Sequence, residues 1–516
     1  MKIVTVEQMR AIEQASVQHG VSLDQLQQNA AAAIAREMAS LLGDASGPLL
    51  FLAGPGNNGR DALIAAAILA EQGRKVRAYL APRVASEDVL IRLRATGGEV
   101  VRHEDPGGPR LLERWIRDSS AVVDGLLGIG ISGQVREPIA GIISVASQES
   151  LASRVPVIAV DLPSGIDAGT GEVGGPAIRA TWTLSLGCIK MGLLRFPAAE
   201  YVGKLVPLEI GLPPESYQGG RIELLTAGDV ARVLPGRPLS GHKGTFGRVL
   251  VVAGSSNFVG AAYLAGGAAA RAGCGLVTLA VPEWQRVSIA SLLPEATYLP
   301  LMETADPQAA RGNAQAIVET LPDCAALAIG PGLGQGQTQT ELVMGVLTAA
   351  RDLEQLHTIV DADGLNALAG VAEWWEKIGH GHVLTPHPGE MSRLTGLPVD
   401  EVNARRWDVA RDAAARWGQT VVLKGAFTVV ASPDGDVWVS GAALPALGTA
   451  GTGDVLTGLV AGLMAQGLSE AAAARAGVFL HAAAAARVLA AAGTDRLLAS
   501  DLLPAIPAAI ARLQTG

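Results

Sequence analysis

Aromatic residues and cysteines are scarce in this chain, and its net charge is negative. Each of these features excludes a class of protein. Aromatic residues make up 4% of the 516 residues, which leaves few rings on which nucleic-acid bases could stack. The net charge of −9 opposes binding to polyanions, so we expect no nucleic-acid partner. The three cysteines (Cys188, Cys274 and Cys324) are isolated in apolar sequence, which indicates neither a disulfide framework nor a metal cluster and suits a reducing cytoplasm.

Long uncharged apolar segments are also missing. Residues 1–7 lack the apolar core of a signal peptide. The most apolar late segment, residues 471–492, carries Arg475, His481 and Arg487 in its middle, which predicts a buried helix and not a membrane span. We therefore expect a cytoplasmic protein with no membrane association. Hydrophobic residues nevertheless make up 49% of the chain, enough to fill large cores.

Short apolar runs alternate with segments of helical periodicity along the whole chain. Apolar strands separated by helices are typical of a parallel sheet covered on both faces, an α/β fold that binds ligands at the carboxyl ends of its strands. In the first half, helices are predicted at residues 6–19 and 22–42 and strands at residues 49–53, 76–80, 121–124, 155–161, 181–186 and 205–210. In the second half, strands are predicted at residues 248–253, 276–281, 325–329, 358–361, 382–385, 420–423, 427–431 and 437–439.

One segment between these halves has the composition of a linker. Residues 211–220 contain three glycines and two prolines. We therefore predict two domains, residues 1–215 and 221–516, each within the size range of α/β domains. No internal repeat relates them.

The most informative motif is Gly448-Thr-Ala-Gly-Thr-Gly-Asp454, which runs into an apolar helical stripe. A glycine-rich turn at a helix N-terminus presents free backbone N–H groups and the positive end of the helix dipole, a favourable place for an anion. An aspartate in the first turn also stabilises a helix without any further role. Phosphoryl transfer to a hydroxyl needs amides for the phosphate and a base for the proton, and Asp454 is the candidate base.

Further motifs of the second half support this interpretation. A lysine with small neighbours and a threonine hydroxyl, combined with the Gly451–Asp454 turn, predict a nucleotide-phosphate site joined to a proton-transfer site. No Walker A sequence is present. The motifs are His242-Lys-Gly-Thr-Phe-Gly-Arg248, Gly330-Pro-Gly-Leu-Gly334, Asp361-Ala-Asp-Gly-Leu-Asn366, Thr385-Pro-His-Pro-Gly-Glu390 and Lys424-Gly-Ala-Phe-Thr428.

Oxygen-bearing side chains follow three predicted strands of the first half. Gly54-Pro-Gly-Asn-Asn-Gly-Arg-Asp61 has the form of a phosphate-binding turn. Asp124 precedes a second glycine-rich loop, and Asp161-Leu-Pro-Ser-Gly-Ile-Asp167 closes a further strand. Carboxylates at strand ends are often only helix caps. Two of them with an asparagine and Ser164 make a set of hard oxygen ligands, which suits an alkali or alkaline-earth cation and not zinc.

These motifs together resemble two known families. Asn57-Asn-Gly-Arg-Asp61, Val123-Asp-Gly-Leu-Leu-Gly-Ile-Gly130, Asp161 to Asp167 and Lys190-Met-Gly-Leu193 resemble the NAD(P)H-hydrate epimerase domain, over most of residues 1–215. The motifs of the second half resemble the ribokinase-like superfamily and, within it, the ADP/ATP-dependent NAD(P)H-hydrate dehydratases, over about residues 225–512. The resemblance implies an N-terminal Rossmann-like three-layer sandwich followed by a C-terminal ribokinase-like α/β domain.

The resemblance also implies roles for individual residues, with Asp161 and Asp454 as the proton-handling groups of the two halves. K+ would be held by Asn58, Asp124 and Ser164. The hydrate in the epimerase half would contact Asn57, Asn58, Gly59, Arg60, Asp61, Gly128, Ile129, Gly130, Ile131, Ser132, Gly133, Gln134 and Asp161. In the dehydratase half it would contact Ala261, Gly334, His387 and Asp454, and the adenine nucleotide would contact Lys424, Gly425, Ala426, Phe427, Thr428, Gly451 and Gly453.

Arg60 departs from the family pattern. The family usually has Gly-Gly-Asp-Gly where this chain has Gly59-Arg60-Asp61-Ala62. An arginine beside the loop could supply a phosphate contact or narrow the pocket.

The implied function is repair of hydrated NADH and NADPH (NADHX and NADPHX). One half would interconvert the two epimers, and the other would dehydrate one of them with ADP or ATP and Mg2+. Two alternatives remain open: a small-metabolite kinase that leaves the phosphate on its product, and a first half that is a non-catalytic binding module. We expect a homo-oligomer, although Ala-rich helices could equally form the core of a monomer.

Overall fold

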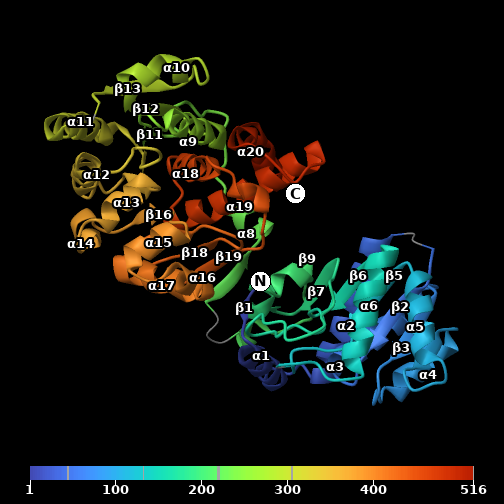
Figure 1. Ribbon diagram of the computed structural model, residues 1–516. Helices are drawn as coiled ribbons and strands as arrows, with labels where there is room; N and C mark the ends of the chain where they lie inside the picture. The colour runs from blue at the N-terminus through green and yellow to red at the C-terminus, as the bar shows by residue number, and fades with distance from the viewer. Residues whose placement is uncertain (44–45, 132, 218–220, 304–305, 515–516) are drawn as a thin grey trace. The chain divides into compact units, whose positions relative to one another are not determined.

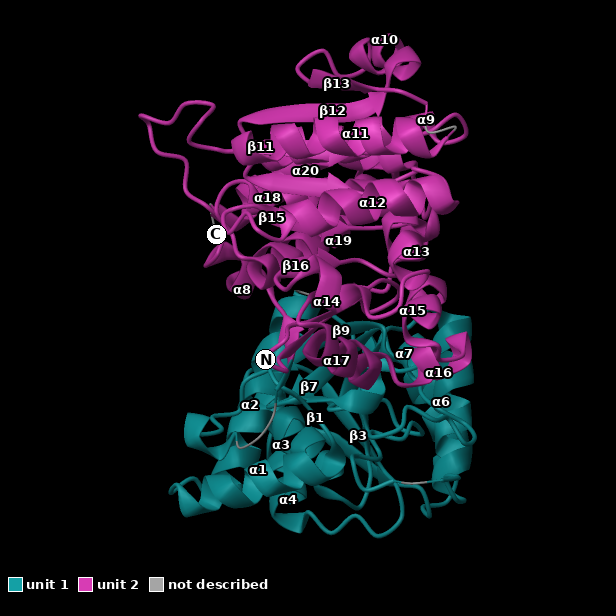
Figure 2. Ribbon diagram, turned by 90° about the vertical axis from the view of Figure 1, so that its left-hand side faces the viewer, with its two compact units in different colours: residues 1–222 teal, residues 223–516 magenta. Residues whose placement is uncertain are grey.

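The computed structural model describes residues 1–43, 46–131, 133–217, 221–303 and 306–514. The chain divides into two compact units, Met1–Ile222 and Glu223–Gly516, which Figure 2 colours separately. Part of the predicted linker belongs to the first unit. Leu212 is packed against its core, and the buried Ser216 accepts a hydrogen bond from Ser16 Oγ at 3.2 Å.

Unit 1 is built on a seven-stranded parallel sheet with the strand order β4-β3-β2-β5-β6-β7-β9 (Figure 1). Its strands are β2 (Leu49–Ala53), β3 (Val76–Leu80), β4 (Glu99–Arg102), β5 (Ala121–Gly125), β6 (Val157–Val160), β7 (Trp182–Leu186) and β9 (Lys204–Leu208). A separate parallel pair joins β1 (Ile3–Val4) to β8 (Ile189–Lys190). The helices are α1 (Val6–Gln18), α2 (Leu23–Leu42), α3 (Asn57–Glu71), α4 (Glu87–Ala95), α5 (Gly108–Arg117), α6 (Ile139–Ser153) and α7 (Ala199–Val202).

Strand β2 shows why the sheet is covered on both faces. Leu49 and Phe51 pack with α2, α3 and α4, whereas Leu50 and Leu52 pack with α5 and α6. Side chains alternate between the faces of a strand, so an apolar run without polar breaks must be buried on both. The predicted parallel α/β architecture is therefore confirmed.

Unit 2 contains a ten-stranded sheet with the order β10-β19-β18-β17-β16-β15-β14-β11-β12-β13. The strands β13, β12, β11, β14, β15, β16 and β17, which are neighbours in that order, pair in parallel. Strand β18 pairs antiparallel with both β17 and β19. The strands are β10 (Ile222–Leu225), β11 (Arg248–Val252), β12 (Leu276–Pro282), β13 (Thr297–Leu301), β14 (Ala326–Ile329), β15 (His357–Val360), β16 (His382–Leu384), β17 (Thr420–Leu423), β18 (Val429–Ala431) and β19 (Val437–Ser440). The helices are α8 (Ala227–Ala231), α9 (Val259–Ala272), α10 (Arg286–Ala290), α11 (Pro307–Thr320), α12 (Gln337–Ala350), α13 (Asp363–Ala369), α14 (Trp374–Ile378), α15 (Pro388–Thr395), α16 (Val399–Ala404), α17 (Arg406–Trp417), α18 (Thr452–Met464), α19 (Glu470–Ala492) and α20 (Ala499–Gln514).

Helix α18 lies directly against α9 because two glycines remove the side chains that would separate them (Figure 1). A Cβ atom on Gly458 would overlap the carbonyl oxygen of Ala265. On Gly462 it would lie 2.6 Å from the carbonyl oxygen of Ala269. The backbones therefore touch, which fixes where the N-terminus of α18 meets the carboxyl ends of the strands.

Helix α19 is, among the described residues, the one helix that could cross a membrane by length and composition alone. Of its most apolar window, 56% is buried inside unit 2, where it packs against α18 and α20. We interpret it as a core helix.

Candidate active sites

The candidate site of unit 2 is centred on Asp361, which follows β15 and is almost fully buried. Lys424 follows β17 and donates a hydrogen bond from Nζ to Asp361 Oδ1 at 2.6 Å. The second oxygen, Oδ2, accepts a hydrogen bond from Thr457 Oγ1 of α18 at 2.7 Å. Glu390 Oε2 lies 3.8 Å from Lys424 Nζ. Asp361 thus joins the lysine at the sheet edge to the first turns of α18.

Asp454 occupies the first turn of α18 beside this cluster. Burial, and next the negative charge of Asp361, raise the pKa of Asp454 to about 7, while the Lys424 ammonium opposes the rise. A carboxyl with a pKa near 7 is ionised for much of the time at neutral pH and is basic enough to accept a proton. Asp454 is therefore a candidate general base.

The amides preceding Asp454 form the predicted anion-binding turn. Thr452 Oγ1 donates hydrogen bonds to the carbonyl oxygens of Leu447 (2.8 Å) and Thr449 (2.9 Å), which hold the turn in place. Gly451 has φ +90°, a conformation that favours glycine. A Cβ atom on Gly453 would lie 3.5 Å from Lys424 Nζ. The helix N-terminus and the ammonium group therefore converge on one place, as phosphoryl binding requires.

The predicted nucleotide loop, residues 424–428, is a tight turn between β17 and β18. Thr428 Oγ1 donates a hydrogen bond to the carbonyl oxygen of Gly425 at 2.8 Å. Arg406 Nη2 donates to the carbonyl oxygens of Leu423 (3.0 Å) and Lys424 (2.9 Å). Burial lowers the pKa of Arg406 to about 10. Arg406 therefore holds the end of β17 from which Lys424 projects.

The residues predicted to contact the hydrate lie on loops and in the first turns of helices. His387 caps α15, and its Nδ1 accepts the Gly389 amide at 3.0 Å. Burial, and then the charge of Lys424, lower the pKa of His387. The amide of Gly334 donates to Asp363 Oδ2 at 2.8 Å. The Cβ atom of Ala261, in the first turn of α9, is 2.9 Å from the position that a Cβ atom on Gly332 would take.

Asp361 and Glu390 lie in motifs recognised in the sequence, but no role was predicted for either residue. Thr457 and His481 were not predicted to belong to the site. Thr457 lies three residues after Asp454 and Glu390 three after His387, a spacing that places side chains on one helix face. His481 of α19 hydrogen-bonds to the backbone of Thr452, and burial lowers its pKa to about 4. Nothing in its Ala-rich surroundings in the sequence indicates this contact.

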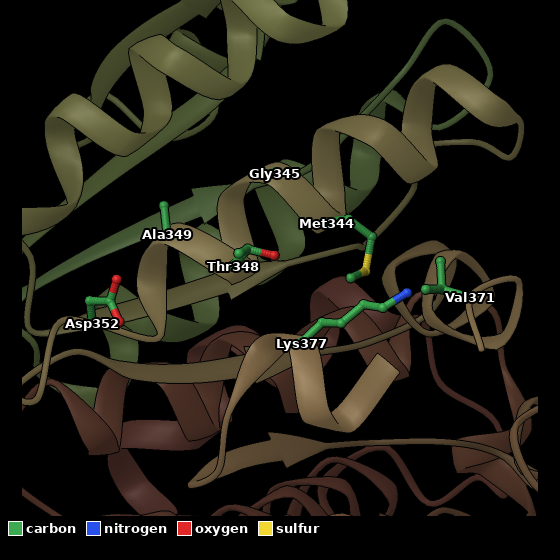
Figure 3. A pocket seen from close by; sticks show the side chains of 7 residues that line it. All are labelled: Met344, Gly345, Thr348, Ala349, Asp352, Val371 and Lys377. Carbon is green, nitrogen blue, oxygen red and sulfur yellow. The ribbon is translucent and has the colours of Figure 1, made fainter. Parts of the chain in front are cut away.

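A shallow pocket elsewhere in unit 2 contains none of the predicted site residues (Figure 3). It is lined mainly by apolar or small side chains of α12, with Lys377 of α14 opposite. The lining is Met344, Gly345, Thr348, Ala349, Asp352, Val371 and Lys377. This pocket is not part of the candidate active site of unit 2.

The candidate cation site of unit 1 is organised by Asp124, which is completely buried near the end of β5. Its Oδ1 accepts hydrogen bonds from Ser164 Oγ (2.7 Å) and the Leu126 amide (3.1 Å), and its Oδ2 from the Ser164 amide (2.7 Å). Asn58 Nδ2 donates to the carbonyl oxygen of Leu127 at 2.7 Å. Burial raises the pKa of Asp124 to about 6. The structure therefore brings together the three predicted ligands around one short loop.

A second charged group in unit 1 surrounds Asp161. The Lys190 ammonium, which is buried, forms an ion pair with Asp161 Oδ1 and donates to the carbonyl oxygen of Leu186 at 2.8 Å. Asp161 has φ +65°, a conformation rarely adopted by residues other than glycine. Burial, opposed by Gln27 and reinforced by Asp161 and Glu13, raises the pKa of Asp61 to about 7. Lys190 and Glu13 had no predicted role.

The glycines of the Gly54–Asp61 turn are required by close backbone approach. A Cβ atom on Gly54 would overlap the carbonyl oxygen of Leu126, and one on Gly59 would overlap that of Gly54. The Asp61 Oδ1 atom is buried and has no hydrogen-bond partner among the described residues. Arg60 is turned toward α4, where its guanidinium pairs with Asp88 at 2.9 and 3.0 Å.

The predicted loop at residues 128–134 is irregular, and Ser132 within it lies outside the described residues. Across the described part of the chain, no three side chains of His, Cys, Asp or Glu are arranged to hold a metal ion. A cation in unit 1 would therefore depend on the Asp124 carboxylate together with amide, hydroxyl and backbone oxygens, the ligands that alkali cations accept.

Comparison with known proteins matches a different family to each unit. Residues 23–192 match the family described as YjeF-related protein N-terminus, and residues 249–508 match NAD(P)H-hydrate dehydratase. The bifunctional NAD(P)H-hydrate repair enzyme of Moorella thermoacetica is 37% identical over 90% of this chain and 88% of its own length. That of Thermofilum pendens is 36% identical over 100% and 97%.

Two solved structures resemble unit 2. The ADP/ATP-dependent NAD(P)H-hydrate dehydratase of Bacillus subtilis, co-crystallised with ATP/Mg2+, is 35% identical, covering 56% of this chain and 98% of that one with a TM-score of 0.49. A ribokinase-like superfamily protein of Enterococcus faecalis is 23% identical, covering 57% and 98% with a TM-score of 0.50, and it indicates the fold.

Two α/β units, each with paired acidic and basic groups at the carboxyl edge of its sheet, define a two-site enzyme. The chain belongs to the family of bifunctional NAD(P)H-hydrate repair enzymes.

Proposed function

We propose that unit 2 dehydrates NADHX or NADPHX with ADP or ATP and that unit 1 interconverts the two epimers of these hydrates. The observation that carries the proposal for unit 2 is the convergence of Lys424, the Gly451–Gly453 amides and Asp454 on one place. A base beside an anion-binding turn can activate a hydroxyl while the phosphoryl group is held.

In the proposed reaction, Asp454 takes the proton from the ring hydroxyl, whose oxygen attacks the terminal phosphorus of the nucleotide. The bond from that phosphorus to the nucleotide breaks, leaving AMP from ADP or ADP from ATP. Hydroxide is a poor leaving group and phosphate a better one. The carbon–oxygen bond of the phosphorylated ring then breaks, phosphate leaves, and loss of a proton from the adjacent carbon restores the ring double bond.

Lys424 and the amides of Gly451 and Gly453 would stabilise charge on the transferring phosphoryl group. Mg2+ bound to the nucleotide would neutralise phosphate charge, and the nearby carboxylates of Asp361 and Asp363 are of the hard-oxygen type that it prefers. Asp361 fixes the orientation of Lys424, so we propose it as a positioning residue.

For unit 1 we propose Asp161 as a proton-handling group, supported by its buried ion pair with Lys190. K+ held by Asn58, Asp124 and Ser164 would balance the negative charge of the buried Asp124 carboxylate. The ordered turn at Gly54 and Asp61 would contact the hydrate.

The test is restoration of the near-ultraviolet absorbance of reduced nicotinamide from a mixture of both hydrate epimers, with ADP, Mg2+ and K+. Complete recovery with one phosphate released for each ring restored would support both activities. Recovery that stops once one epimer is consumed would contradict the role of unit 1. Phosphate that stays on the product would contradict dehydration and favour a metabolite kinase.

A further inference from the structure

Phe258 occupies the N-cap position of α9 and is not one of the predicted site residues. Its side chain is 53% exposed, although the chain has only six phenylalanines and most large apolar residues are buried. A single exposed apolar residue is ordinary on a protein surface. The place of Phe258 in the fold is what distinguishes it.

One side of Phe258 lies against the predicted hydrate-binding loop. Its Cβ atom is 2.6 Å from the position that a Cβ atom on Gly332 would take, and the Cβ atom of Ala261 is 2.9 Å from it. Gly332 has φ +62° and belongs to the same turn as Gly334, whose amide is held by Asp363. The first turn of α9 and this loop therefore form one continuous wall.

The same helix reaches the phosphoryl site. Leu264 Cδ1 lies 2.7 Å from the position of a Cβ atom on Gly451, in the anion-binding turn. Six residues of α-helix rise about 9 Å, so Phe258 lies about as far from that turn as a six-membered ring would reach if its hydroxyl were hydrogen-bonded to Asp454 and its face were stacked on an aromatic side chain. A ring whose hydroxyl is presented to Asp454 would extend along α9 toward Phe258.

We propose that the hydrated nicotinamide ring stacks on Phe258 in the dehydratase site, an inference that rests on the proposed function of unit 2. Water added next to the ring nitrogen leaves the N–C=C–C=O segment conjugated and flat. Aromatic side chains stack on flat, polarisable groups of this kind. The phenyl ring also shields one face of the substrate from water, which limits hydrolysis of a phosphorylated ring.

The experiment compares the Phe258→Leu, Phe258→Tyr and Leu292→Ala variants of the full chain with the wild type. Leu292 is a matched control because it is 62% exposed and lies in the turn after α10. Loss of the phenyl ring should raise the KM for the hydrate about 10-fold, which is within the usual contribution of one stacking contact to binding. The KM for ADP should stay at its wild-type value. Phe258→Tyr and Leu292→Ala should behave as the wild type.

The hydrate of reduced nicotinamide mononucleotide, which lacks the adenosine part, separates ring stacking from adenine stacking. The KM increase in Phe258→Leu should persist with this shorter substrate. An increase that disappears would overturn the inference, as would equal increases in the KM for hydrate and for ADP. If the wild type restores no reduced nicotinamide, the proposed function itself fails. If the wild type is active and Phe258→Leu retains its KM, only the role of Phe258 is wrong.

Discussion

Replacing Asp454 by asparagine tests two things: whether Asp454 is the general base, and how much its buried negative charge destabilises unit 2. Asparagine keeps the shape of the side chain but cannot accept the proton of the ring hydroxyl. We expect kcat for dehydration to fall by about 10²–10⁴-fold, the usual contribution of a general base. The amides of Gly451 and Gly453 stay in place, so the KM for ADP should change little. Steady-state release of phosphate measures both quantities.

The same substitution should stabilise unit 2 at high pH. The pKa of Asp454 rises from 3.8 to about 7 on folding, so the folded state binds the proton more tightly than the unfolded state does. The cost of ionising Asp454 is therefore absent below pH 4, grows between pH 4 and 7, and reaches roughly 2–4 kcal/mol above pH 7. The dipole of α18 favours the charged form by only about 0.3–1 kcal/mol, so burial outweighs it.

Differential scanning calorimetry at pH 4 and pH 8 measures this effect. The transition of unit 2 is identified as the one that ADP and Mg2+ move to higher temperature. The asparagine variant should match the wild type at pH 4 and unfold at higher temperature at pH 8. The exposed Asp352, replaced by asparagine, is the control and should change neither stability nor activity. Dehydration within tenfold of the wild type, or a variant less stable at pH 8, would refute the reasoning.

Three further predictions concern single residues. Asp161→Asn, which tolerates the left-handed backbone at this position, should stop epimerisation and leave dehydration intact; unchanged exchange of the epimers, followed by NMR, would contradict the assignment. Arg60→Ala should leave epimerisation unchanged and cost no more than about 1 kcal/mol of unit 1 stability, because its ion pair with Asp88 is half exposed; a large rise in the KM for the hydrate would instead indicate a substrate contact. Gly458→Ala should lower the melting temperature of unit 2, because the added Cβ atom overlaps the carbonyl oxygen of Ala265; an unchanged transition would mean that α18 and α9 can separate at no cost.

Most of the strands that were predictable from the sequence are buried on both faces, although the partly buried edge strand β9 was also predicted. The run at residues 49–53 is apolar without a break, and it forms β2 as predicted. Strands β4 and β13 escaped prediction because they lie at sheet edges, where Glu99, Arg102 and Thr297 are tolerated. At an edge the pairing partner, and not the hydrophobic pattern, decides whether a segment becomes a strand.

The motifs of the two sites were also predictable, since glycines at strand ends leave a local signal. Their side-chain partners were not. Asp361 and Thr457 are separated by 96 residues, and Asp161 and Lys190 by 29. The residues of such a pair come together only because of the order of the strands in the sheet. A local sequence pattern therefore cannot predict that they are partners.

The two sites share one electrostatic arrangement although their folds and loops differ. In each, a lysine pairs with one carboxylate at a strand end, Asp361 in unit 2 and Asp161 in unit 1. A second carboxylate nearby, Asp454 or Asp61, is not the one paired with the lysine, and burial raises its pKa to about 7. Two carboxylates in unequal surroundings are the usual means of obtaining a group that exchanges protons at neutral pH. By pairing with one carboxylate each, the lysines leave a second carboxylate in each unit with a pKa near neutrality.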